Sequence, residues 1–113
     1  MKIKHLESGG DLFIYLYGEL DECSASKTRE IIDEIIAKPI MKNRVIFNFS
    51  NTTFMDSTGI GMLIGRYKKL KAKNIPVYVQ NPTSSVEKIL EISGLYKIMP
   101  KIWGEFICIT KWV

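Results

Sequence analysis

The sequence predicts an α/β fold, with helices packed on a mixed, mostly parallel sheet of about four to five strands. Strand-like segments alternate along the chain with segments whose apolar residues recur at helical spacing. Two strand-like segments come first, with a short glycine-containing turn between them, so the N-terminal strand is expected to lie antiparallel at one edge of the sheet. We expect residues 1–113 to form a single domain, which is long enough to bury a core of its own.

The first three elements follow from simple patterns. Lys2–Glu7 and Leu12–Tyr17 are expected to be strands, and the turn "SGGD" between them contains the glycines that tight hairpins need. The second strand is apolar or aromatic on both faces, which indicates that both faces are covered. Ser26–Ala37 is expected to form a helix, because its four isoleucines make one apolar stripe and Pro39 follows its end.

The middle of the chain predicts a strand, a loop, a long helix and another strand. Arg44–Phe49 is the strand, and "SNTTFMD" after it is expected to be a loop. Thr58–Lys73 carries apolar residues at the i, i+3, i+4 and i+7 positions of a helix with one buried face, and Asn74 is a stop signal. The segment "IPVYVQ" is the next expected strand.

The last part of the chain is expected to contain a helix and a short strand. Ser84 and Glu87 have the spacing of a capping box at a helix start, and Gly94 is a stop signal for that helix. Lys97–Ile102 is expected to be a final strand. The apolar tail 103–113 could form either a helix or a strand, and it could pack as an extra element or drive self-association. We expect a monomer.

Composition and charge disfavour several functional classes. Positive charge is concentrated in the C-terminal half of the helix 58–73, where the helix dipole favours cations, and no nucleic-acid motif accompanies it. No apolar run is long enough to span a bilayer, and no secretory segment precedes the first strand. We therefore expect a cytoplasmic protein without a nucleic-acid or membrane partner. Cys23 and Cys108 match no metal-ligand spacing, so no metal site is expected.

The junction "FMDSTGIG" places a polar segment between a strand-like segment and the helix 58–73. Ser57 has the position of an N-cap, whose hydroxyl would accept a hydrogen bond from an early helix amide. As a nucleophile it would need a base, but His5 is the only histidine, and the nucleophile-elbow and phosphate-loop patterns are both missing. We therefore expect no enzymatic activity and no cofactor.

Two glycines in the first turn of this helix call for a reason beyond capping. Gly59 and Gly61 each cost about 1 kcal/mol of helix stability relative to alanine, which indicates that another segment or a partner approaches the backbone here. A serine at a helix start is also a candidate phosphorylation site, because free amides and the helix dipole accept a phosphate. The residues alone leave the cap, the close approach and the switch open.

At this junction the sequence resembles a known family. "FMDSTGIGMLIGRYKKLK" is similar to the signature segment of STAS domains that act as anti-sigma factor antagonists, in particular those of sporulation. Further segments agree with the family in the same order, over roughly Leu12 to Met99: "GELDECSASKTRE", "RVIFNFSNTTFMD" and "SSVEKILEISGLYKIM". The resemblance implies the STAS fold, with helices packed on a mostly parallel sheet.

The resemblance also implies a mechanism. Members of this branch bind an anti-sigma factor that is also a serine kinase, and thereby free a sigma factor. Phosphorylation ends this binding, and a PP2C-type serine phosphatase reverses it. The family's acceptor serine directly follows an aspartate, so Asp56 and Ser57 match this pair here, with Thr58 as the second choice. Asp21 matches an acidic residue that lies near the acceptor in the family.

The helix after the junction offers further candidate contacts. Met62, Arg66 and Lys69 lie on one flank by helical stepping, with Lys73 one turn further on, and an ordinary solvated helix edge explains the same pattern. One alternative function is a STAS scaffold, or a small-ligand or lipid-transport accessory module, without a phosphorylation switch. Another is a nucleic-acid binder driven by the lysine-rich helix. The net charge of +4 and the apolar tail 103–113 depart from the family pattern, which leaves the identity of the partner open.

Overall fold

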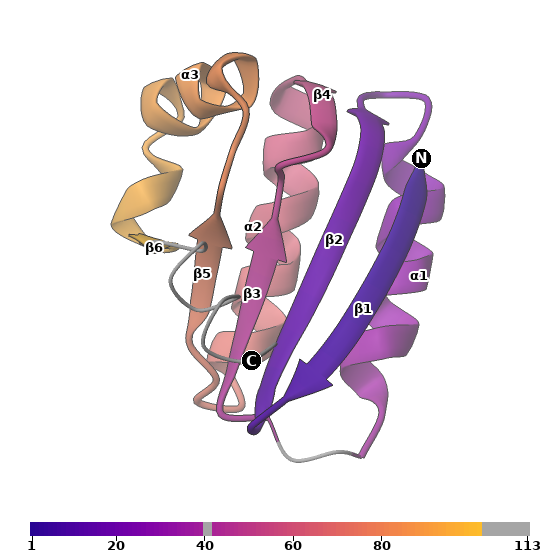
Figure 1. Ribbon diagram of the computed structural model, residues 1–113, viewed down its shortest axis with the longest axis vertical. Coiled ribbons are helices and arrows are strands. Elements are labelled where there is room, and N and C mark those ends of the chain that lie inside the picture. Colours follow the sequence, from indigo (N-terminus) through magenta and orange to yellow (C-terminus); the bar gives the residue numbers. More distant parts are fainter. Residues whose placement is uncertain (40–41, 103–113) are drawn as a thin grey trace.

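The structure is a computed structural model that describes residues 1–39 and 42–102 (Figure 1). The tail 103–113, whose conformation the sequence left open, and Cys108 within it lie outside the described residues. Along the chain the elements are β1 (Lys2–Ser8), β2 (Asp11–Leu20), α1 (Ala25–Ala37), β3 (Arg44–Asn48), β4 (Thr52–Met55), α2 (Ser57–Lys71), β5 (Val77–Gln80), α3 (Ser84–Ile92), the 3-10 turn η1 (Leu95–Lys97) and β6 (Lys101–Ile102).

The strands form one mixed sheet, as predicted. The spatial order is β1-β2-β3-β5-β6, and β4 pairs with the far end of β2. β1 and β2 are antiparallel, whereas every other pairing is parallel. Figure 1 shows α1 and α2 behind the sheet and α3 above the end of β5. The two long helices therefore cover the same face, and the starts of α2 and α3 lie at the end of the sheet where the parallel strands finish.

The core lies between the sheet and these helices. Leu12, Ile14 and Leu16 alternate along β2 and are buried, because side chains two apart on a strand share a face. The isoleucine stripe of α1 packs against them, as its helical spacing predicted. Gly94 adopts a left-handed conformation with φ of 76° at the end of α3, which confirms it as a stop signal.

One strand was missed, because "SNTTFMD" was expected to be a loop. Residues Thr52–Met55 of this segment form β4, which pairs with Gly18, Glu19 and Leu20 of β2. β2 continues beyond the predicted Tyr17 through Gly18, whose φ of 107° accompanies an irregularity in the pairing. The buried Thr52 hydroxyl donates a 2.7 Å hydrogen bond to the carbonyl of Leu16. The extension of β2 therefore supplies the edge on which β4 forms.

The third helix begins differently from the prediction. Ser84 is the first helical residue and Thr83 occupies the N-cap position without a side-chain cap hydrogen bond, so the expected capping box does not form. The Glu87 carboxylate instead accepts hydrogen bonds from Tyr96 and Lys101. The final strand is also shorter than expected, because residues 95–97 form the 3-10 turn and pairing starts only at Lys101.

Candidate functional site

The start of α2 is built on an aspartate. β4 delivers the chain to Asp56 in an extended conformation, and Oδ1 of its carboxylate accepts hydrogen bonds from the amides of Thr58 (2.9 Å) and Gly59 (3.2 Å). Asp56 is therefore the N-cap, and the prediction that Ser57 caps the helix was wrong. Ser57 is already helical, so α2 runs from Ser57 to Lys71 rather than from Thr58 to Lys73.

Because Asp56 rather than Ser57 caps the helix, the Ser57 hydroxyl is not used as a capping group. Ser57 and Thr58 are both exposed, and neither hydroxyl makes a hydrogen bond with any residue in the described part of the chain. The positive end of the helix dipole lies at this same turn, although the amides of Thr58 and Gly59 are already bonded to Asp56. The site thus presents a solvent-accessible nucleophilic oxygen at a position that tolerates negative charge.

The two glycines of this turn have different surroundings. A Cβ atom on Gly59 would lie 2.9 Å from the carbonyl oxygen of Leu20 and 2.9 Å from the side chain of Met55. Gly59 therefore lets the helix start pack closely against the ends of β2 and β4. Gly61 is exposed, and a Cβ atom there would meet no atom within 4 Å. The fold explains Gly59, whereas approach of a partner at Gly61 stays a prediction.

Asp21 lies after the neighbouring strand. Leu20 at the end of β2 pairs with Met55 at the end of β4, so Asp21 and Asp56 each follow one of two adjacent parallel strands. Oδ1 of Asp21 accepts hydrogen bonds from the amides of Cys23 (2.9 Å) and Ser24 (3.0 Å), which order the turn into α1. The topology brings the two predicted aspartates to the same edge of the sheet, and each holds the start of a helix.

A groove runs between the first turns of α1 and α2. Its volume is about 360 Å³, and its lining combines polar and apolar residues: Glu22, Ala25, Ser26, Arg29, Thr58, Gly61, Met62 and Arg66. Because Thr58 and Gly61 belong to the turn that carries Ser57, the groove adjoins the exposed serine. It forms a recess beside the candidate site.

The predicted flank of α2 is mostly packed against α1. Met62 is 7% exposed and Arg66 is 6% exposed, and both line the groove. Nε of Arg66 lies 2.9 Å from Oδ1 of Asp33 on α1, although the N–H is not directed at that oxygen, and Nζ of Lys69 lies 3.1 Å from Oδ2 of the same carboxylate. Arg66 is thus a buried cation held by α1, whereas Lys69 and Lys73 keep exposed surface.

An exposed aromatic residue near the site was not singled out from the sequence. Phe54 on β4 is 47% exposed and lies three residues before Ser57. Its register partner Glu19 is also exposed, whereas the next pair, Leu20 and Met55, is buried. Burial does not alternate along β4, because Thr52 and Met55 are buried whereas Thr53 and Phe54 are exposed, so no period-2 pattern in the sequence marks Phe54 as an outward residue.

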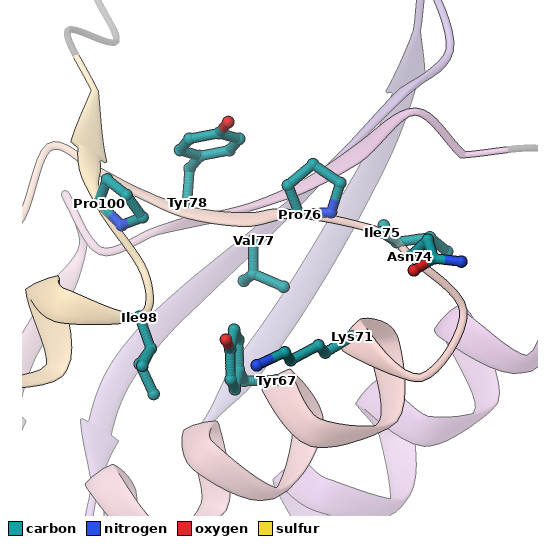
Figure 2. A pocket seen from close by; sticks show the side chains of 9 residues that line it. All are labelled: Tyr67, Lys71, Asn74, Ile75, Pro76, Val77, Tyr78, Ile98 and Pro100. Carbon is teal, nitrogen blue, oxygen red and sulfur yellow. The ribbon is translucent and has the colours of Figure 1, made fainter.

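A second pocket lies at the other end of α2. Figure 2 shows it between the last turns of α2 and the start of β5, with a volume of about 370 Å³. Two of its lining residues contact each other: the Lys71 ammonium lies 5.8 Å from the centre of the Tyr67 ring. The lining contains no acid–base pair or nucleophile with a base, so this pocket offers no chemistry to match the exposed Ser57.

Within residues 1–39 and 42–102, no three His, Cys, Asp or Glu side chains gather in a way that could hold a metal ion. In the same residues no helix combines the length and apolarity that crossing a membrane requires. Cys23 is an exposed free thiol.

Known proteins similar to this chain agree on one fold. The family model of the STAS domain matches residues 2–105. The anti-sigma F factor antagonist of Paenibacillus polymyxa is 34% identical over 102 residues, which are 90% of this chain and 86% of that protein. The structure of the anti-sigma factor antagonist SpoIIAA in its unphosphorylated form superposes with a TM-score of 0.76 at 29% identity, covering 95% of this chain and 93% of that one. The Bacillus cell fate determinant SpoIIAA in its phosphorylated form gives a TM-score of 0.69 at 28% identity, covering 95% and 96%. This chain belongs to the STAS domain family.

Proposed function

We propose that this protein is an anti-sigma factor antagonist whose binding is switched off by phosphorylation of Ser57. The observation that carries the proposal is the exposed hydroxyl of Ser57 at the start of α2, next to the capping Asp56. The Paenibacillus polymyxa relative that shares 90% of the chain is an anti-sigma F factor antagonist, and one SpoIIAA structure is of a phosphorylated form. In the unphosphorylated state the chain would bind an anti-sigma factor and thereby free a sigma factor.

The proposed partners follow from the chemistry of the switch. An anti-sigma factor that is also a serine kinase would transfer the γ-phosphoryl group of ATP to Oγ of Ser57, releasing ADP and the hydroxyl proton. A PP2C-type serine phosphatase would hydrolyse the phosphoserine to serine and inorganic phosphate. The exposure of the first turn gives both enzymes access to the same oxygen.

The phosphate would leave the domain folded but change the docking surface. A helix start accepts an added charge of about −1.5 to −2, because its amides and dipole favour anions. Asp56 already uses two of those amides, and it brings its own negative charge to the turn. At an effective dielectric constant near 20, a unit charge about 5 Å from another contributes roughly 3 kcal/mol. A partner carboxylate facing the phosphate would therefore be repelled by enough to weaken binding about a hundredfold.

The assignment is tested by labelling with the cognate kinase and ATP, followed by mass spectrometry of the wild type and the variants Ser57→Ala and Thr58→Ala. We expect one phosphate on the wild type and on Thr58→Ala, located at residue 57, and none on Ser57→Ala. Thr58→Ala is the matched control, because it removes the neighbouring exposed hydroxyl of the same turn. Labelling of Ser57→Ala at the wild-type rate would contradict the proposal.

A further inference from the structure

The groove between the first turns of α1 and α2 has two arginines in its lining, one from each helix. Arg29 of α1 is exposed, and its guanidinium makes no hydrogen bond or ion pair with the described residues. Arg66 of α2 is buried, with a side chain that is 7% exposed. Arg29 lies four residues after Ala25 and Arg66 lies four residues after Met62, so each arginine continues the face of its helix that lines the groove.

The guanidinium of Arg66 has hydrogen-bond donors that the fold does not use. Nε lies 2.9 Å from Oδ1 of Asp33 without directing its N–H at that oxygen, and neither Nε nor Nη1 has a hydrogen-bond partner among the described residues. Both of these atoms are shut off from solvent, whereas Nη2 is not, and Nη2 also makes no hydrogen bond with a described residue. Buried polar groups in folded proteins are nearly always hydrogen-bonded, because a donor without an acceptor costs free energy. Arg66 is therefore a buried cation in the wall of the groove that still lacks an acceptor.

Gly61 lies in the same groove, and its surroundings in the fold do not require a glycine. A Cβ atom at this position would meet no atom within 4 Å, although glycine destabilises a helix relative to alanine. Ala25 and Ser26, which line the groove from the side of α1, are also small. The recess thus opens between small residues of both helices, and a side chain from outside has room to enter it.

The charges around the groove leave one positive charge in excess. Glu22 in the lining balances one of the two arginines. Asp33 balances the other, but the Lys69 ammonium pairs with the same carboxylate. Asp21 and Asp56 accept amide hydrogen bonds at the two helix starts and are not part of the lining. This balance fits a group with a single negative charge, which is a carboxylate rather than a phosphate dianion.

We propose that the groove binds the carboxylate of an aspartate or glutamate side chain of the anti-sigma factor, between Arg29 and Arg66. The inference rests on the proposed function, since it assigns one contact to the partner named there. A guanidinium donates two parallel hydrogen bonds to a carboxylate, and both arginines have donors available for this. Because Thr58 also lines the groove, a phosphate on the neighbouring Ser57 would repel the bound carboxylate. The same contact therefore supports binding and makes it sensitive to phosphorylation.

The experiment measures binding of the full, unphosphorylated chain to its cognate anti-sigma factor by isothermal titration. Arg29→Glu should weaken binding at least about tenfold, because it removes the guanidinium donors and places a like charge beside the carboxylate. Gly61→Ala should weaken binding about threefold while the protein stays folded, because its methyl group occupies part of the recess. Circular dichroism shows whether each variant keeps the native fold.

Lys27→Glu is the matched control for Arg29→Glu. It makes the same change of charge at an exposed residue of the same helix, two positions earlier and therefore on a different side of α1. Lys27 lines a different recess, beside Asp21 and Cys23. We expect Lys27→Glu to bind the anti-sigma factor within about twofold of the wild type.

The acidic residue of the partner is located by changing each exposed aspartate and glutamate of the anti-sigma factor to lysine. One of these changes should restore binding of Arg29→Glu to within about threefold of the wild-type pair, because it re-forms an ion pair of reversed polarity. In this charge-swapped pair, phosphorylation of Ser57 should weaken binding much less than in the wild-type pair, since a lysine attracts the phosphate.

Three results would overturn the inference and leave the proposed function standing, provided that phosphorylation of Ser57 still releases the anti-sigma factor. The first is wild-type affinity of both Arg29→Glu and Gly61→Ala. The second is equal weakening by Arg29→Glu and Lys27→Glu, which would indicate a general effect of charge. The third is the lack of any charge-swapped rescue, which would mean that the occupant is not an acidic side chain. A wild-type chain that does not bind the anti-sigma factor would instead contradict the proposed function itself.

Discussion

The starts of α2 and α3 are alike in sequence and different in structure. Both follow a strand, and both open with consecutive hydroxyl residues: Ser57 and Thr58 in α2, and Ser84 and Ser85 after Thr83 in α3. At α3 two of the three hydroxyls are tied to β4, because Oγ1 of Thr83 donates to the carbonyl of Thr52 (2.8 Å) and Oγ of Ser85 donates to the carbonyl of Thr53 (3.3 Å), whereas the exposed Ser84 makes no hydrogen bond with the described residues. At α2 an aspartate does the capping, so the described structure leaves both hydroxyls open to solvent.

The difference teaches which feature makes a helix start available for modification. A hydroxyl that caps a helix or anchors a strand is part of the fold, and changing it costs stability. At α2 the N-cap is Asp56, one residue before Ser57, so the Ser57 hydroxyl is not needed to cap the helix. Beside the first turn of α2 lie also a groove and the exposed Phe54. The start of α2 therefore offers the exposed surface that the proposed switch needs, whereas two of the three hydroxyls at the start of α3 hold the fold together.

The largest effect is expected from placing a negative charge at each helix start in turn. Ser57→Asp should weaken binding of the anti-sigma factor about a hundredfold, equivalent to about 2.7 kcal/mol, because the charge faces the partner. Ser84→Asp is the matched control, with the same change at an exposed first helical residue, and should bind like the wild type. The two dissociation constants are compared by isothermal titration. Equal weakening by both variants would remove the distinction between the two starts.

The next effect concerns the two glycines of α2. Gly59→Ala should lower the free energy of unfolding by about 1–3 kcal/mol, because its Cβ would clash with the backbone of Leu20 and the side chain of Met55. Gly61→Ala should raise the same free energy by about 1 kcal/mol, because the site has room and alanine favours the helix. Urea denaturation measures both. A stable Gly59→Ala variant would mean that the close approach is not needed by the fold.

The smallest effect concerns the cap itself. Asp56→Ala should lower the free energy of unfolding by about 1 kcal/mol, whereas Asp56→Asn should stay near the wild type, because asparagine caps a helix about as well as aspartate. Thermal unfolding of the two variants shows the difference. An Asp56→Ala variant as stable as the wild type would contradict the assignment of Asp56 as the cap that stabilises α2.

Patterns local to the chain predicted most of the fold. The helices followed from apolar residues at helical spacing, and the stop at Gly94 from its backbone freedom. β4 was missed because a four-residue strand with two threonines has little pattern of its own and forms only where β2 extends past Tyr17. Its existence depends on pairing between distant segments, which a local pattern does not contain.

For the site, residue types were predictable and their surroundings were not. The motif singled out Asp21, Asp56 and Ser57, and the topology brings the turns that carry them to one edge of the sheet. Choosing between Asp56 and Ser57 as the cap required the helix start to within one residue, a precision that spacing lacks. Helical stepping likewise placed Arg66 on a flank but could not show that Asp33 of α1 covers that flank.

The central claim is that one phosphate on Ser57 changes the docking surface and spares the fold. Its most direct test is to titrate the anti-sigma factor with this protein before and after enzymatic phosphorylation, and to record thermal unfolding of both samples. The account predicts a dissociation constant about a hundredfold higher for the phosphorylated form and melting temperatures that agree closely. Equal affinities, or a phosphorylated sample that has lost its folded structure, would contradict it.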